Sequence, residues 1–190
     1  MTTYELTKPL ETERLLLRPY KGSDFEALHA MRSNEEAARY LYWDPQTEDE
    51  VRQTLTKKIA SVSLRSEGDV LALAAEHRAT QDVVADVILH WVSRDHGLAE
   101  IGYIVHPDHA GRGYATEASR PLLAVAFDGL RLHRVIGRAE ARNAGSARVL
   151  EKLGMRREAH LVENEFVKGE WTDELVYAIL DREWAARQSS

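Results

Sequence analysis

The feature that most constrains this chain is a short glycine-bearing loop between an apolar run and a segment with helical periodicity. The apolar run at residues 101–105 is Ile-Gly-Tyr-Ile-Val, and the loop at residues 110–113 is Ala-Gly-Arg-Gly. A helix that begins after such a loop points unpaired N–H groups and its positive dipole end outward. A strand, a glycine loop and a helix N-terminus often hold a phosphate. The chain is therefore predicted to bind a phosphorylated ligand.

Length and composition predict one domain over residues 1–190, with its core at about 11–182. The hydrophobic fraction of 44% can fill a core, and no apolar run approaches the roughly 20 residues that span a bilayer. The net charge of −6 argues against nucleic-acid binding, which usually needs a basic face. The chain has no cysteine, so disulfides, thiolate metal sites and a cysteine nucleophile are excluded. No export signal is evident, and we expect a cytoplasmic protein without a membrane or nucleic-acid partner.

Residue periodicity predicts an α/β fold with a mixed, mostly antiparallel sheet of about seven strands and about four helices. The expected strands are 13–19, 70–76, 83–92, 99–105, 134–141, 155–167 and 171–180, and the expected helices are 23–31, 48–66, 116–129 and 143–154. Three of the strands should form an antiparallel meander, and a βαβ crossover should follow it.

Two finer expectations concern the second helix and the chain ends. The buried face of the second helix is predicted to consist of Val51, Leu55, Ile59 and Val62. Residues 1–10 and 183–190 are predicted to be loose.

The glycine loop alone does not identify its ligand. Thr116 replaces the third glycine of a dinucleotide-binding fingerprint, and no Lys-Ser or Lys-Thr pair follows as in a phosphate-binding P-loop. A tight strand-to-helix turn that binds nothing therefore stays open as an alternative.

Four segments in the expected order narrow the interpretation. They are residues 12–18, 99–103, 111–118 and 143–155, and together they resemble the GNAT superfamily of N-acetyltransferases, specifically its RimJ/RimL-type branch. The resemblance covers about residues 11–182. It implies a GNAT-like fold in which two parallel strands splay apart, and an enzyme that uses acetyl-CoA as cosubstrate and needs no metal.

The resemblance also implies where CoA binds. The pyrophosphate would rest on the loop residues Gly111, Arg112, Gly113, Tyr114, Ala115 and Thr116. The pantetheine arm would extend along Ile104 and Val105, and the amide of Asn143, a helix N-cap, would contact it. Ala110 departs from the family pattern, which usually has Gln or Arg there, but most phosphate contacts come from backbone.

Three residues are candidates for the chemistry. Glu165 is the first candidate for the general base, because related enzymes place a glutamate there and Glu163 is expected on the same strand face. A solvated acidic strand edge is the alternative. Glu100 is the second candidate, in the strand beside the acetyl group, although it can equally be an outward-facing strand residue.

The leaving thiol has its own candidate. Ser146 matches a serine that RimL-type enzymes place next to the CoA sulfur, although a serine near a helix start can also bind only local backbone. Many superfamily members use a tyrosine four positions later, which here is Leu150.

Two further groups complete the sequence picture. The cluster at residues 106–109, His-Pro-Asp-His, is explained by a turn and lacks a third metal ligand. Tyr40, Tyr42 and Trp43 are expected either to line the acceptor pocket or to be core aromatics. The acceptor is expected to be a protein N-terminal amine or a small-molecule amine. A non-catalytic acyl-CoA-binding module and a homodimeric assembly remain open.

Overall fold

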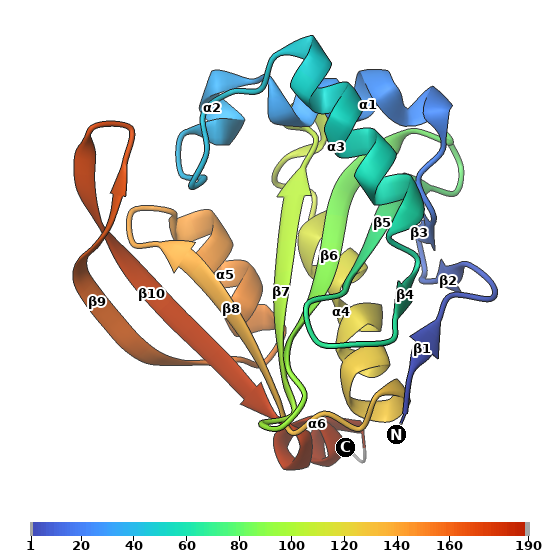
Figure 1. The fold of residues 1–190 in the computed structure, drawn as a ribbon, viewed down its shortest axis with the longest axis vertical. Coiled ribbons are helices and arrows are strands. Elements are labelled where there is room, and N and C mark those ends of the chain that lie inside the picture. Colours follow the sequence, from blue (N-terminus) through green and yellow to red (C-terminus); the bar gives the residue numbers. More distant parts are fainter. Residues whose placement is uncertain (1, 189–190) are drawn as a thin grey trace.

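The fold is built on one mixed sheet of eight strands, as the computed structural model shows for residues 2–188, apart from the side chain of Ala37. The strand order is β2-β3-β5-β6-β7-β8-β10-β9 (Figure 1). Its strands are β2 (Leu10–Glu11), β3 (Leu15–Arg18), β5 (Val70–His77), β6 (Val83–Ser93), β7 (Leu98–Val105), β8 (Arg134–Glu140), β9 (Arg156–Val167) and β10 (Glu170–Leu180). A separate pair joins β1 (Tyr4–Glu5) to β4 (Ser63–Leu64). The predicted fold class is confirmed, with one more strand in the main sheet than expected.

Helices cover both faces of this sheet (Figure 1). Within the described chain they are α1 (Phe25–Arg32), α2 (Glu35–Ala38), α3 (Glu48–Ala60), α4 (Tyr114–Ala124), α5 (Ala144–Lys152) and α6 (Asp181–Gln188). One apolar cluster joins α1 and α3 to one face, and a larger one joins α4 and α5 to the other. Because side chains alternate along a strand, neighbouring residues of β6 and β7 face different helical layers.

The parallel strands β7 and β8 separate soon after they meet, which is the expected splay. Their register contains three pairs, and the last of them joins Glu100 to Ile136. The pairing of β7 with β6, in contrast, continues to Val105. Figure 1 shows the two strands diverging from their common end. Beyond Glu100, the edge of β7 that faces β8 is therefore not used by the sheet.

The second predicted helix is shorter than expected, and its buried face differs. Helix α3 ends at Ala60. Val51 and Leu55 are buried as predicted, but Ile59 is 41% exposed and Lys58 takes the next buried position. Lys58 is tolerated there because its ammonium group meets the carboxylate of Asp86 at 2.8 Å. The periodicity of apolar residues cannot predict an ion pair with a residue on another element.

The prediction that both chain ends are loose is wrong for the described residues. Near the N-terminus, Tyr4 pairs with Leu64 across β1 and β4. Near the C-terminus, Trp184 of α6 is buried and its ring stacks on Phe127. Its indole N–H donates to the carboxylate of Asp128. Each end is held because one aromatic side chain, Tyr4 or Trp184, packs on the main apolar core although its sequence neighbours are mostly polar.

Candidate active site

The glycine loop has the backbone that a helix-terminal anion site requires. Gly111 and Gly113 have φ values of 76° and 82°, in the left-handed region that glycine adopts without strain. Gly113 immediately precedes α4, which begins at Tyr114. An added Cβ on Gly113 would meet no atom closer than 3.7 Å, so conformation rather than space requires glycine there. The loop thus presents the N-terminus of α4 to its surroundings.

A partly buried network fixes the start of α4 against the N-terminal strand segment. The Glu117 carboxylate accepts from the Thr12 hydroxyl at 2.7 Å and from the Arg14 backbone N–H at 2.8 Å. The Arg14 guanidinium pairs with the same carboxylate at 2.6 Å and lies over the Tyr114 ring. Burial opposes ionisation of Glu117, but hydrogen bonds from Thr12 and Arg14 outweigh it and lower its pKa. Two segments that are distant in sequence therefore act as one support for the loop.

One large cleft, of about 980 Å³, runs from this loop along the unpaired edge of β7. This volume is at the upper end of the range for small-molecule sites. Except for Glu165, the predicted site residues all line it: Glu100, Ile104, Val105, Gly111, Arg112, Gly113, Tyr114, Ala115, Thr116, Asn143 and Ser146. Ala110 lines it as well. These features fit a long phosphorylated ligand: the glycine loop can hold a phosphate, and the free strand edge and the large cleft leave space for an extended chain.

Ser146 lies in this cleft with a tyrosine beside it. The Asn143 side chain caps α5 by accepting from the Ser146 N–H at 2.9 Å, as the sequence predicted. The Tyr103 hydroxyl of β7 donates to the Ser146 carbonyl at 2.9 Å and lies 3.0 Å from the Ser146 Oγ. Burial raises the pKa of Tyr103, so its phenol stays protonated. Leu150, where many superfamily members have a tyrosine, is buried against Gly137. The phenol near Ser146 is instead that of Tyr103, which the sequence did not single out.

Glu100 lies where the parallel strands part. Both of its carboxylate oxygens accept from Arg138 of β8, at 3.1 and 3.2 Å. Arg138 also lies 3.7 Å from Glu174, which is 2% exposed and accepts from the Tyr42 hydroxyl at 2.7 Å. Burial and this hydrogen bond raise the pKa of Tyr42. The cluster joins β7, β8, β10 and the loop before α3. These contacts are between residues distant in sequence, and no local sequence pattern predicts the whole cluster.

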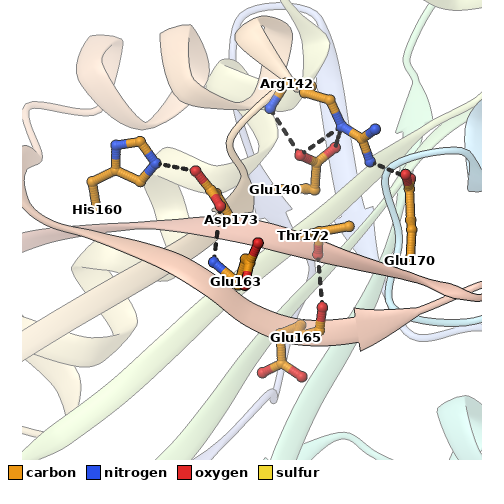
Figure 2. Close-up of polar contacts among 8 residues, drawn as sticks. All are labelled: Glu140, Arg142, His160, Glu163, Glu165, Glu170, Thr172 and Asp173. Atoms are coloured by element: carbon orange, nitrogen blue, oxygen red, sulfur yellow. Dashed lines mark hydrogen bonds and ion pairs between the residues drawn. The ribbon is translucent and has the colours of Figure 1, made fainter.

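Glu165 is absent from the cleft wall, and it does not share a face with Glu163. Thr172 pairs with Glu165, but two residues later Glu174 pairs with Leu161, so β9 carries extra residues in a bulge. Glu163 lies in the bulge with a φ of 49°. Figure 2 shows the two carboxylates pointing to opposite sides of the strand. The shared-face prediction is wrong because the bulge breaks the two-residue period.

A polar clasp holds this bulge. One carboxylate oxygen of Asp173 accepts from the Glu163 backbone N–H at 2.9 Å, and the other lies 2.7 Å from the His160 Nε2 (Figure 2). The hydrogen bond from Glu163 and the one from His160 lower the pKa of Asp173. Glu165 lies on the far side of this clasp, and its charge contributes to the raised pKa of Tyr42. It is therefore a neighbour of the cleft rim, and its assignment as base stays a prediction.

The aromatic residues before α3 belong to the cleft. Tyr40, Tyr42 and Trp43 all line it. Trp43 also stacks under the guanidinium of Arg32, at 4.3 Å from the ring centroid. This placement favours the acceptor-pocket interpretation over that of plain core aromatics.

The histidines near the loop form ring contacts. The rings of His106 and His109 meet edge to face, with centroids 5.4 Å apart. Within residues 2–188, no three His, Cys, Asp or Glu side chains are grouped as metal ligands would be. The helices in that part of the chain are also too short or too polar to cross a membrane.

Comparisons with known proteins point to one family. Residues 14–156 match the family described as the acetyltransferase (GNAT) domain. A GNAT-family acetyltransferase structure from Bacillus anthracis superposes with a TM-score of 0.82 at 30% identity, covering 92% of this chain and 99% of that one. The uncharacterized N-acetyltransferase YoaA of Bacillus subtilis is 30% identical over 171 residues, which are 90% of this chain and 96% of its own.

A relative with a named acceptor is more distant. The spermidine N(1)-acetyltransferase of Vibrio cholerae is 26% identical over 161 residues, or 84% of this chain and 89% of its own. A structure of spermidine N-acetyltransferase from that organism, with CoA and spermine, superposes with a TM-score of 0.77 at 24% identity over 92% of this chain and 99% of that one.

Proposed function

This chain belongs to the GNAT acetyltransferase family and is an acetyl-CoA-dependent N-acetyltransferase, and from that premise we propose that it acetylates a primary amine by direct attack in a ternary complex. The observation that carries the proposal is the continuous cleft from the glycine loop to the strand fork. It joins the N-terminus of α4, where we expect phosphate to bind, to an unpaired strand edge and to candidate proton-transfer groups. No residue of this chain needs to carry the acetyl group.

The proposed binding mode follows the cleft. The N–H groups of Gly111 to Thr116 hold the pyrophosphate, and Arg112 adds a charge-assisted contact. The free edge of β7 at Ile104 and Val105 pairs with the amides of the pantetheine arm as an added strand would. This arrangement places the thioester near the fork of β7 and β8.

The proposed chemistry is a nucleophilic acyl substitution. The amine nitrogen bonds to the thioester carbon, the carbon–sulfur bond breaks, and one proton passes from the amine while the thiolate gains one. Backbone N–H groups on the free edge of β7 stabilise the oxyanion. We assign Glu100 to receive the amine proton through water, because it lines the cleft and Glu165 does not. Glu165 remains the second candidate.

The leaving thiolate is proposed to meet a hydroxyl pair. Ser146 donates to the sulfur, and Tyr103, which lies at hydrogen-bond distance from the Ser146 Oγ, orients the serine hydroxyl. This pair takes the role that we assign to the tyrosine of many superfamily members, whose position is occupied here by the buried Leu150.

The acceptor is proposed to be a small-molecule amine or a protein N-terminal amine. The spermidine acetyltransferase relative supports a small amine, and the RimJ/RimL-type resemblance of the sequence supports a protein N-terminus. The aromatic wall of Tyr40, Tyr42 and Trp43 is compatible with either class.

The test measures CoA release. Because the chain has no cysteine, a thiol-reactive dye reports only released CoA. Acetyl-CoA binding is measured first by calorimetry, and turnover is then measured with monoamines, polyamines, amino acids and short peptides. Binding together with turnover of at least one amine is expected. Binding without turnover of any amine would support a non-catalytic acyl-CoA-binding module instead.

A further inference from the structure

Two cations in the wall of the cleft share one carboxylate. The Lys58 ammonium lies 2.8 Å from Asp86 Oδ1, and the Arg32 guanidinium lies 3.8 Å from Asp86 Oδ2. The Tyr20 hydroxyl donates to the same carboxylate at 2.9 Å. The three charged side chains are at most 13% exposed. In residues 2–188, no second carboxylate forms an ion pair with Lys58 or Arg32, so the group has an excess of one positive charge.

This excess charge is not balanced by the other acids of the cleft. Besides Asp86, the acidic residues of the wall are Glu100 and Glu140. Glu100 is paired with Arg138, and Glu140 accepts from Arg142 at 3.1 Å (Figure 2). A desolvated cation without a full partner is costly, and a bound anion removes that cost.

The neighbouring charges on the same helical layer form a closed network of their own. Arg18 binds Asp24 at 2.7 Å and Glu76 at 2.6 Å, and Lys21 lies 3.9 Å from Glu76. Two cations thus meet two carboxylates there. The network supplies no carboxylate to Lys58.

The cation pair is also held in place. The Arg32 Nε donates to the Gln46 side chain at 2.8 Å, and its guanidinium stacks on Trp43. Burial lowers the pKa of Arg32, although Asp86 opposes this effect. Lys58 is fixed by its bond to Asp86 on one side and lies 5.5 Å from the Tyr20 ring centroid. A ligand would meet an arranged pair of cations rather than two free side chains.

The position of this pair relates it to the reacting atoms. Asp86 is directly opposite Ile104 in the register of β6 and β7, so the two side chains share a sheet face. Adjacent strands are about 4.8 Å apart, and Ile104 lies in the free segment of β7. Arg32, Lys58 and Asp86 all line the cleft on the same side as Trp43. The positive excess is therefore close to the place proposed for the thioester.

We propose that the acceptor carries a carboxylate near its amine, as an amino acid does, and that Lys58 and Arg32 bind that carboxylate. This inference rests on the proposed function, because it assumes that an amine enters this side of the cleft. A polyamine would bring further positive charge to a wall that already has an excess positive charge, and the two would repel each other. A peptide N-terminus lacks a carboxylate next to the amine, because its α-carboxyl group is an amide.

The experiment compares matched acceptors that differ in this one group. The wild-type enzyme is assayed with phenylalanine, phenylalaninamide and phenethylamine, with the same series for other amino acids, and with spermidine. Rates are compared per concentration of unprotonated amine, because the three compounds have different amine pKa values. The acids are expected to have kcat/KM values at least about tenfold above their amides, equivalent to about 1.4 kcal/mol.

Variants test the assigned residues. Lys58→Met is expected to reduce the preference for the acid over the amide about tenfold, mainly through the KM of the acceptor. Lys58→Arg should retain most of the preference. Arg52→Met is the matched control, because Arg52 is an exposed cation of α3 outside the cleft wall. The melting temperature and acetyl-CoA affinity of each variant are measured alongside.

The outcomes separate this inference from the proposed function. Turnover of amines with equal or better use of amides or spermidine by the wild-type enzyme would overturn the carboxylate assignment alone. An unchanged acid preference in folded Lys58→Met enzyme would do the same. Turnover of no amine at all would overturn both the inference and the proposed function. The wild-type comparison holds even if Lys58→Met does not fold.

Discussion

At the scale of single residues, the site depends on side chains whose roles are set by their partners. Glu100 is held by Arg138, Ser146 is held by Asn143 and Tyr103, and each contact comes from a different element. Each carboxylate oxygen of Glu100 accepts one hydrogen bond from Arg138, so each keeps an acceptor site for a water molecule. Water can reach Glu100 because both side chains are partly exposed, at 24% for Glu100 and 42% for Arg138.

Replacement of Glu100 tests the assignment of the base. Glu100→Gln is expected to lower kcat by more than tenfold, with little change in the KM for acetyl-CoA, because only proton removal is affected. Glu165→Gln is the comparison variant and should lower kcat less. Steady-state CoA release checks both. A larger loss from Glu165→Gln would restore it as the base, and a loss below tenfold in both variants would contradict both assignments.

Replacement of the hydroxyl pair tests the thiolate assignment. Ser146→Ala is expected to lower kcat by about tenfold to a hundredfold, the range typical of general acid catalysis. Tyr103→Phe should have a smaller effect, because Ser146 remains. The two losses should not add in the double variant, since the residues act as a unit. Multiplicative losses in CoA-release assays would show that Tyr103 and Ser146 act independently.

At the scale of elements, the glycine loop and α4 form one unit with the N-terminal strand segment. Gly113→Ala is expected to destabilise the fold by about 1 kcal/mol, because alanine is strained at positive φ. It should also raise the KM for acetyl-CoA, since strain at the helix start displaces the N–H groups that we propose bind the pyrophosphate. Thermal unfolding and steady-state kinetics measure the two effects.

Gly68 provides the matched control for that loop variant. Gly68 has a φ of 92° and open space around its Cα, but it is not part of the cleft wall. Gly68→Ala should cost a similar free energy of unfolding and leave the KM for acetyl-CoA unchanged. Equal KM values in the two variants would show that the loop does not position the cosubstrate.

Glu117 ties the same unit to the pH dependence of stability. Its pKa is lowered in the folded state, so its stabilising contribution is complete above its ordinary pKa and is lost as the pH falls through the folded value. The wild-type melting temperature should therefore fall more steeply than that of Glu117→Gln below about pH 4.5. At pH 7 the variant should be less stable by about 1 kcal/mol. If the melting temperatures of both proteins change equally between pH 7 and pH 3, the Glu117 carboxylate does not stabilise the fold as proposed.

At the scale of the whole molecule, the sequence predicted what is local and missed what depends on tertiary partners. The meander, the crossover and the Asn143 cap follow from periodicity and short-range chemistry, and the structure confirms them. The burial of Lys58 depends on Asp86, which is 28 residues away in the chain. The bulge at Glu163 depends on Asp173 of the next strand. No local pattern encodes such pairs.

The candidate site divides in the same way. Its proposed cosubstrate side is made of the loop, the free edge of β7 and the start of α5, each of which has a sequence signature. Its proposed acceptor side is made of Arg32, Lys58, Asp86 and Trp43, which meet only in the folded chain. The acceptor is therefore named from charge and burial rather than from a motif.

The initial-rate pattern of the enzyme is the direct test of acetyl transfer within a ternary complex. Acetyl-CoA and an accepted amine are varied together, and CoA release is measured with a thiol-reactive dye. Direct attack in one cleft that holds both substrates predicts intersecting lines in a double-reciprocal plot. Parallel lines, the pattern of an acetyl-enzyme intermediate, would contradict direct attack by the amine.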